Sequence, residues 1–296
     1  MSAALRLATR GSPLALAQSG FVRDRLAAVG IASTLVVVET EGDRRSEVAL
    51  EELAGRGVFV KEVQAAVLDG RADVAVHSAK DLPAATPEGL VLAAVPERGD
   101  PADVLVGRAL GVLAPGATVA TGAPRRRALL LAERPDLNVV GLRGNIARRL
   151  AAVGANGVEA VVVAAAALAR LGLTERAAER LDPERFVPQV GQGAIALECA
   201  EGDDARSALS RIDDASAHLE LRCERAFLRA LGAGCELPGG ALARVDGDQV
   251  TVRGVLATED GGSVVRATVA DADPERAGTA LAATLRDELR RAHAPR

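Results

Sequence analysis

Aromatic side chains are nearly absent from this chain of 296 residues, which contains four phenylalanines and no tryptophan or tyrosine. Its cores must therefore be built from alanine, valine and leucine, and few rings are available for base stacking. The formal net charge of −4 also lacks the basic excess that is typical of nucleic-acid-binding proteins. These absences argue against a nucleic-acid partner.

Long apolar runs and metal-ligand spacings are missing as well. No stretch of about 18 uninterrupted apolar residues predicts a membrane span, and the N-terminal residues have no signal-peptide layout. The three cysteines, Cys199, Cys223 and Cys235, are odd in number and widely spaced, and there are three histidines. We therefore expect a cytoplasmic protein without a membrane span or a metal site.

The most informative stretch is residues 72–83, Ala-Asp-Val-Ala-Val-His-Ser-Ala-Lys-Asp-Leu-Pro. Its first half has the apolar pattern of a buried strand, and Pro83 prevents an easy continuation. Open α/β sheets place their chemistry at the carboxyl ends of strands, so Lys80 and Asp81 are candidate site residues. An ordinary solvated ion pair at a strand end would explain the same two residues.

Two breaks rich in proline and glycine divide the chain, at residues 91–106 and 183–193. Strands and helices alternate before and between the breaks, which predicts parallel βαβ units. The strand expected at 194–199 returns to the first sheet, and hairpin-linked strands follow a long helix in the last third. The predicted fold class is α/β, with two lobes around a hinged cleft and a small α+β domain. The expected ranges are 1–97 with 194–212 for the first lobe, 102–188 for the second lobe and 215–296 for the C-terminal domain.

Two further features lie near the N-terminus. Ser12 and Pro13 are typical of a helix start, and the helix should reach about Val29. Residues 40–57 are polar and contain three glycines, and they are long for a connection inside a domain. They are either a mobile active-site loop or a surface excursion without a role.

Arginines gather where predicted strands pass into helices: Arg10, Arg125, Arg126, Arg127, Arg143, Arg148 and Arg149. Arginine opposes the helix dipole at these positions, whereas an anionic ligand would benefit from the dipole and the guanidinium groups. The alternative is that the arginines are solvated, above all Arg127 and Arg148. Phosphate-binding glycine motifs are missing, which favours a carboxylate-rich small molecule. A non-catalytic two-lobed receptor for such an anion fits these residues as well as an enzyme does.

Seven short motifs together resemble those of the porphobilinogen deaminase family, also called hydroxymethylbilane synthase. They are residues 6–18, 57–62, 72–83, 142–145, 169–173, 190–194 and 234–235. They occur in family order and span nearly the whole chain. The resemblance implies two lobes like those of periplasmic binding proteins and a third domain that carries a covalent dipyrromethane cofactor.

The same resemblance implies a monomeric transferase of tetrapyrrole and haem biosynthesis. Such an enzyme joins four porphobilinogen molecules head to tail, releases ammonia, and frees hydroxymethylbilane by hydrolysis. It also implies a transient hand-over of the product to uroporphyrinogen-III synthase.

Site residues follow from the resemblance position by position. Cys235 matches the cysteine that forms the cofactor thioether, and Asp81 matches the central acid, which stabilises positive charge on pyrrole nitrogens. The residues implied to contact substrate or cofactor are Arg10, Ser12, Gln18, Phe59, Lys80, Thr121, Arg125, Arg126, Arg143, Arg149, Arg170 and Gln192. Residues 40–57 match the family's mobile flap.

One motif departs from the family pattern. This chain has Thr121-Gly122-Ala123 where the family usually has Thr-Ser-Ser, so two hydroxyl donors are missing. Backbone N–H groups or Arg127 would have to replace them.

Overall fold

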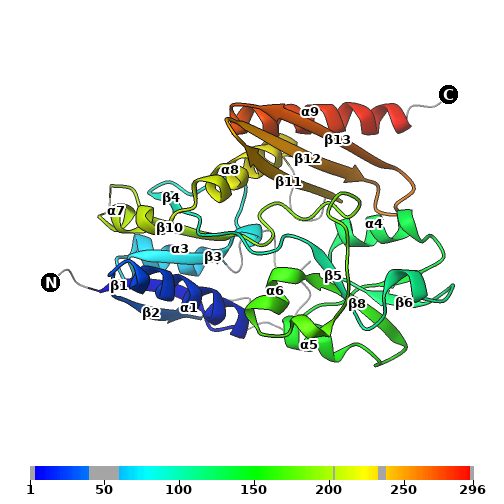
Figure 1. Cartoon of the computed structure of the whole chain (residues 1–296), viewed down its shortest axis with the longest axis horizontal. Coiled ribbons are helices and arrows are strands. Elements are labelled where there is room, and N and C mark those ends of the chain that lie inside the picture. The colour runs from blue at the N-terminus through cyan, green and yellow to red at the C-terminus, as the bar shows by residue number, and fades with distance from the viewer. Residues whose placement is uncertain (1–3, 40–59, 203, 233–237, 294–296) are drawn as a thin grey trace.

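The computed structural model describes residues 4–39, 60–202, 204–232 and 238–293. These residues form three parts, each built on its own sheet, which we call the first lobe, the second lobe and the C-terminal domain (Figure 1). In Figure 1 the two lobes lie side by side below the C-terminal domain. Within the described ranges, no helix combines the length and the apolar character needed to cross a membrane.

The first lobe is a five-stranded sheet in the order β2-β1-β3-β10-β4. Its strands are β1 (Leu5–Arg10), β2 (Ser33–Val38), β3 (Val74–Ser78), β4 (Leu90–Ala94) and β10 (Ile195–Ala200). Its helices and turns are α1 (Pro13–Ala28), α3 (Lys61–Leu68), η1 (Ala79–Asp81), α7 (Ala205–Leu209) and η4 (Ser210–Ile212). Ser12 caps α1 and Pro13 opens it, as the sequence predicts. Leu7, Val74 and Ile195 form part of the buried core.

The second lobe repeats this arrangement in the order β7-β6-β8-β5-β9. Its strands are β5 (Asp103–Val106), β6 (Thr118–Ala120), β7 (Asn138–Val140), β8 (Val158–Ala164) and β9 (Ala177–Arg180). Its helices and turns are η2 (Leu110–Val112), α4 (Pro124–Glu133), α5 (Ile146–Ala151), α6 (Ala165–Arg170) and η3 (Thr174–Arg176). The core is aliphatic, with Leu105, Leu129 and Val162 fully or almost fully buried.

One strand of each sheet, β10 in the first and β5 in the second, runs antiparallel to the other four, a direction for which the sequence analysis made no prediction. β10 pairs antiparallel with both β3 and β4, and β5 pairs antiparallel with both β8 and β9. The chain enters each of these strands after crossing from the other lobe. The right-handed crossover that makes neighbouring strands parallel therefore does not apply to them.

The two crossing segments, residues 95–102 and 188–194, lie against each other between the lobes. Gly99 N donates to Gly193 O at 3.0 Å, and Arg98 Nε donates to Gln192 O at 3.0 Å. Gly193 has a φ of +86°, and a Cβ there would lie 2.4 Å from Gly99 O. Only glycine fits at position 193 in this approach.

The C-terminal domain packs two helices on one side of an antiparallel sheet, β11-β12-β13. Its elements are α8 (Ala215–Leu231), β11 (Gly239–Asp246), β12 (Gln249–Ala257), β13 (Val264–Asp271) and α9 (Pro274–His293). Phe227 and Leu281 meet in its core. The predicted α/β class, with two lobes and a small α+β domain, is confirmed, and α8 lies between the first lobe and the late sheet (Figure 1).

Candidate active site

Asp81 lies at the carboxyl end of the central strand of the first lobe. β3 ends at Ser78, and η1 carries Lys80 and Asp81 directly after it. Asp81 is half-buried, and its carboxylate makes no hydrogen bond to the described residues. The sequence pattern of residues 72–83 correctly places Asp81 at the end of a strand, and its role as a site residue stays a prediction.

The second crossing segment fixes this turn. Ala79 N donates to Ala194 O at 3.1 Å, and Gln189 Nε2 donates to Lys80 O at 3.2 Å. Gly191 has a φ of +72°, and a Cβ there would lie 2.9 Å from Lys80 N. The crossing segment therefore touches the turn so closely that it sets the position of Lys80 and Asp81 relative to the second lobe.

Cations from both lobes converge beside Asp81. The pKa of Lys80 is lowered to about 8, first by burial and then by Arg126 and Arg149 of the second lobe, while Asp81 opposes the shift. Burial and Arg126 also lower the pKa of Arg149, which Asp81 raises. These effects require proximity, so the two lobes bring the four residues together.

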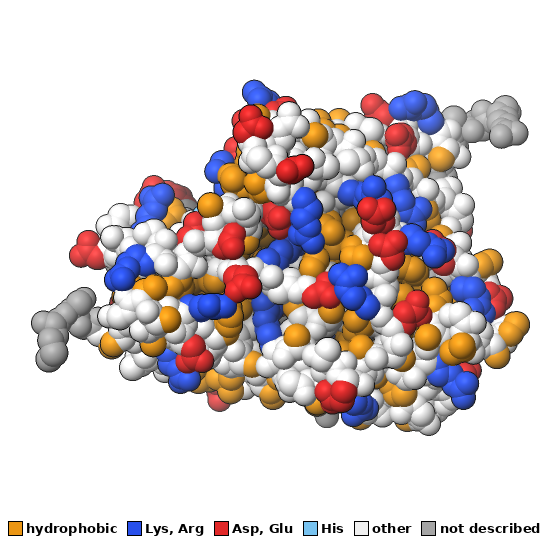
Figure 2. All heavy atoms as spheres, in the orientation of Figure 1, with side chains coloured by type: hydrophobic (Ala, Val, Ile, Leu, Met, Phe, Trp, Pro, Cys, Tyr) orange, Lys and Arg blue, Asp and Glu red, His pale blue; other side chains and the backbone are white. Residues whose placement is uncertain are grey.

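The converging cations have few protein partners. Arg149 Nε donates to Gly144 O at 2.9 Å, but its terminal nitrogens and Lys80 Nζ make no hydrogen bond to the described residues. On the face seen in Figure 2, lysine and arginine side chains reach into the hollow between the three parts. Lys80 and Arg149 are desolvated and have no carboxylate hydrogen-bonded to them among the described residues, which fits a ligand that carries carboxylates.

Arg125 and Arg126 are held by a buried acid that the sequence analysis missed. Asp103 is 1% exposed and binds Arg125 at 2.7 Å and Arg126 at 2.8 Å. Gln192 Nε2 donates to the same carboxylate at 2.8 Å. Burial alone would raise the pKa of Asp103, but the two arginines and Gln192 hold it below its ordinary range.

This network changes the interpretation of the arginine pattern. The alternative interpretation, solvated charge, is wrong for Arg125 and Arg126, because both are buried, and each already has a carboxylate partner. Gln192 is also fully buried and bridges Arg126 and the carbonyl of Pro101. The only signal for Asp103 was an acid at the start of an apolar strand, and nothing in the sequence linked it to arginines 22 residues away.

Other predicted contact residues stabilise the cleft walls. Gln18 is buried and donates to Ser78 Oγ at 2.7 Å, which joins α1 to β3. Ser12 Oγ accepts from Ala15 N at 3.3 Å. Thr121 is buried, and its hydroxyl accepts from Ala123 N at 3.3 Å. Ser12 and Thr121 lie at the ends of α1 and β6, whereas Gln18 lies in the second turn of α1.

Three predicted arginines and three other predicted sites complete the comparison. Arg170 donates to Gly193 O at 2.7 Å, and burial lowers its pKa to about 10. Arg10 is half-buried at the end of β1, and Arg143 is exposed between β7 and α5. Phe59, Cys235 and the loop of residues 40–57 lie outside the described residues.

The departure at Thr121-Gly122-Ala123 has a local structural reason. A Cβ on Gly122 would lie 2.4 Å from the carbonyl oxygen of Leu142, so this backbone path excludes a serine side chain. Arg127 does not replace the missing hydroxyl donors, because it is exposed and its guanidinium donates to the carbonyl of Val139.

A second buried acid joins the C-terminal domain to the crossing segments. Glu224 on α8 is fully buried and accepts hydrogen bonds from Arg98 Nη1 at 2.7 Å and Gly191 N at 2.7 Å. It also accepts from Ala243 N on β11 at 3.0 Å. One carboxylate thus connects α8, β11 and both crossing segments, which the amphipathic pattern of α8 does not reveal.

Fold and site together define a two-lobed α/β protein with a cationic cleft between the lobes and an α+β domain attached to their junction. Such clefts suit small ligands with several polar groups. Residues 5–208 match the family model described as "Porphobilinogen deaminase, dipyromethane cofactor binding domain". Residues 218–287 match "Porphobilinogen deaminase, C-terminal domain". The chain belongs to the porphobilinogen deaminase family.

Curated relatives agree over almost the full length. The porphobilinogen deaminase of Syntrophotalea carbinolica is 44% identical over 96% of this chain and 93% of its own. The porphobilinogen deaminase of Thermus thermophilus is 47% identical over 88% of this chain and 87% of its own. That of Bacillus subtilis is 39% identical over 97% of this chain and 94% of its own.

Partial similarity to solved structures is also found. The methionine binding protein MetQ has a TM-score of 0.44 and 11% identity, and the match covers 70% of this chain and 87% of that one. A periplasmic substrate-binding protein from Coxiella burnetii has a TM-score of 0.43 and 15% identity, and the match covers 75% of this chain and 96% of that one.

Proposed function

We propose that this chain is a porphobilinogen deaminase that condenses four porphobilinogen molecules head to tail on a dipyrromethane primer. It releases ammonia at each addition and frees hydroxymethylbilane by hydrolysis. The observation that carries this proposal is the carboxylate of Asp81, which has no hydrogen-bond partner among the described residues and lies among cations of both lobes.

Asp81 is the group we expect to act in each condensation. When bound, the primer supplies a nucleophilic pyrrole carbon. Asp81 accepts hydrogen bonds from pyrrole N–H groups and stabilises the positive charge that develops on their nitrogens. A carboxylate fixed in a partly desolvated site stabilises that charge more in the transition state than in the ground state, and so raises the rate.

The cations beside Asp81 bind the acetate and propionate groups of the pyrroles. Lys80 and Arg149 are the foremost candidates, because Lys80 Nζ and the terminal nitrogens of Arg149 make no hydrogen bond to described residues. Arg125, Arg126 and Gln192 position this surface through Asp103. The remaining contacts of this proposal are Arg10, Ser12, Gln18, Phe59, Thr121, Arg143 and Arg170.

Cys235 is the proposed attachment point of the primer. Cys199 and Cys223 are fully buried in hydrophobic cores. Burial and the neighbouring Glu224 raise the pKa of the Cys223 thiol to about 12, so it has almost no thiolate near neutral pH. A thioether requires a reactive, accessible sulfur, which disfavours both buried cysteines.

The wider proposals concern organisation and context. We propose a cytoplasmic monomer divided at residues 1–97 with 194–212, 102–188 and 215–296. The labile product passes to uroporphyrinogen-III synthase by a transient contact.

The role of Asp81 is tested by the Asp81→Asn substitution. The variant should bind substrate yet lose turnover by at least about a hundredfold, because the isosteric amide carries no negative charge. Asp73→Asn is the matched control. Asp73 precedes the same strand at its other end and pairs with Arg6, so this variant should keep its turnover. Near-normal turnover of Asp81→Asn would refute the role.

Attachment of the primer is tested by intact mass spectrometry. The purified chain should exceed its sequence mass by one dipyrromethane, and Cys235→Ser should lack that excess. An adduct that persists in Cys235→Ser would move the attachment elsewhere. A chain with no adduct and no ammonia release from porphobilinogen would instead support a non-catalytic carboxylate receptor.

A further inference from the structure

The long helix α8 carries a second polar face, directed away from the crossing segments. His218, Arg222, Arg225 and Arg229 follow one another at intervals of four, three and four residues, so they share one side of the helix. Glu224, which binds the crossing segments, lies on the opposite side. The helix therefore presents a basic stripe to the back of the first lobe.

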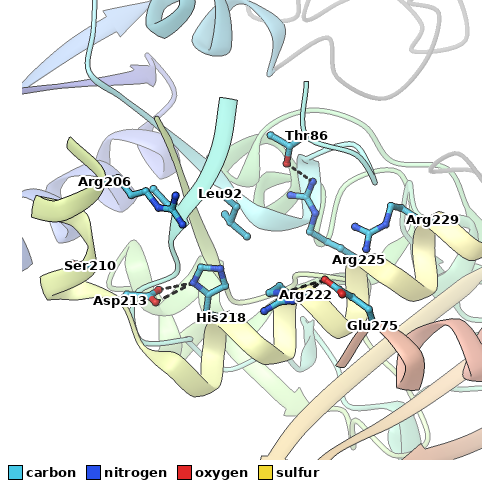
Figure 3. A pocket seen from close by; sticks show the side chains of 11 residues that line it. Thr86, Leu92, Arg206, Ser210, Asp213, His218, Arg222, Arg225, Arg229 and Glu275 are labelled. Atoms are coloured by element: carbon cyan, nitrogen blue, oxygen red, sulfur yellow. Dashed lines mark hydrogen bonds and ion pairs between the residues drawn. The ribbon is translucent and has the colours of Figure 1, made fainter. Parts of the chain in front are cut away.

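This stripe lines a cavity of about 520 Å³ between the first lobe and the C-terminal domain. Thr86, Leu92 and Arg206 close it from the first lobe, and Glu275 closes it from α9. Figure 3 shows Arg206 entering from α7 on one side and Arg225 and Arg229 from α8 on the other, with Leu92 between them. We call this cavity the interdomain pocket.

Positive charge exceeds negative charge in the interdomain pocket. Four arginines line it against two acids, Asp213 and Glu275. Both acids are already engaged: Glu275 binds Arg222 at 2.9 Å, and Asp213 accepts from His218 Nδ1 at 2.9 Å and from Val95 N at 2.7 Å. These contacts account for one of the four arginines.

The other three arginines make no ion pair with a carboxylate among the described residues, although the buried Glu198 lies close enough to Arg225 to raise its pKa. The side chain of Arg206 makes no hydrogen bond or ion pair to them. Arg225 is 5% exposed, and its Nη2 donates only to Thr86 Oγ1 and Ala84 O, at 3.0 and 3.4 Å. Arg229 Nη1 reaches the same carbonyl at 3.4 Å.

The arginines that share the pocket also oppose one another electrostatically. Burial lowers the pKa of Arg225, and although Glu198 raises it, the neighbouring Arg229 lowers it further. Guanidinium groups crowded in this way cost free energy unless an anion separates them. The volume falls within the range of small-molecule pockets, about 300–1,000 Å³, and exceeds the needs of a single inorganic ion.

We propose that the interdomain pocket binds a small organic polyanion, with two or more carboxylate or phosphate groups, that bridges Arg206 of the first lobe and the arginines of α8. None of its lining residues belongs to the proposed substrate or cofactor contacts, so it is a separate site. Arg225 donates hydrogen bonds to residues 84 and 86, which closely follow Asp81. An anion bound here therefore also stabilises the segment that follows η1.

The test measures binding of citrate and of pyrophosphate to the full-length, cofactor-loaded protein by isothermal titration calorimetry. The pocket variant is Arg206→Ala/Arg229→Ala, in which both replaced side chains are exposed and folding should be retained. Arg290→Ala is the matched control, an exposed arginine on α9 outside the pocket. Arg149→Ala reports on binding of the same anions beside Asp81.

We expect one probe anion per chain, bound roughly a hundredfold more weakly by the pocket variant, about tenfold for each lost guanidinium contact. Arg290→Ala and Arg149→Ala should bind as the parent does. The probe with the higher affinity, citrate or pyrophosphate, shows whether the pocket prefers carboxylate or phosphate groups. Failure of both probes to bind the parent at millimolar concentration would overturn the proposal. So would unchanged binding by the pocket variant, or loss of binding in Arg149→Ala alone.

Discussion

Replacing Asp103 by asparagine should destabilise the second lobe far more than any exposed charge change of the same kind. The carboxylate is 1% exposed and binds two guanidinium groups that are themselves buried. Asparagine keeps the shape and one acceptor but leaves both cations without a counter-charge. Breaking a buried ion pair from one side typically costs about 3–5 kcal/mol, so the melting temperature should fall by roughly 5–15 °C.

The neighbouring acid provides a matched control. Asp100 also pairs with an arginine, Arg180, at 2.6 Å, but the two side chains are 36% and 53% exposed. Asp100→Asn should cost about 1 kcal/mol or less, because exposed pairs are screened by water. Urea and thermal unfolding are best followed by far-ultraviolet circular dichroism, since the chain has no tryptophan or tyrosine. Equal losses in the two variants would refute the reasoning.

The pH dependence of the same variant gives an independent check. The folded-state pKa of Asp103 lies below its ordinary value, so its contribution to stability is present above pH about 4 and is lost as the pH falls further. The difference in unfolding free energy between parent and Asp103→Asn should therefore shrink below pH 4. A difference that grows on acidification would contradict the assigned ion pairs.

Three other predictions concern the site and its support. Gly191→Ala should lower the free energy of unfolding more than Gly30→Ala does. Both glycines have a positive φ, but only a Cβ at position 191 would clash with the backbone after β3. Equal losses in thermal unfolding would contradict this contact between residue 191 and the turn after β3. Lys80 is one of two lysines and should titrate near pH 8 in Cys235→Ser protein, as followed by NMR of the ¹³C-methylated amine. Its titration midpoint should be higher in cofactor-loaded protein. A midpoint above about 10 without cofactor would exclude the desolvated site. Glu224→Gln should cost about 3 kcal/mol or more and increase protease cleavage between the domains, and unchanged cleavage would deny it a connecting role.

Local signals in the sequence predict the elements well where a few residues decide the backbone. The cap formed by Ser12 and Pro13 gives the start of α1, and Asp246-Gly247 gives the turn between β11 and β12, where Gly247 has a φ of +61°. The polar turn after β3 likewise places Asp81 at a strand end. Each of these features depends on neighbours within about four residues.

Long-range features could not be predicted in this way. The reversed direction of β5 and β10 depends on where the chain crosses between lobes, which periodicity does not encode. The partners of Asp103 come from α4 and from the second crossing segment, and a single sequence does not reveal such pairings. For the same reason, the sequence pattern of α8 predicted only its apolar face, although its two polar faces contact different parts of the molecule.

The paired crossing segments restrict how the two lobes can separate. Both covalent connections pass through one small region, held by Gly99 N to Gly193 O and by Arg98 Nε to Gln192 O. A rotation of one lobe against the other must therefore have its hinge in that region, because both connections cross there. Glu224 fastens the C-terminal domain to the same region, so that domain is attached at the pivot itself.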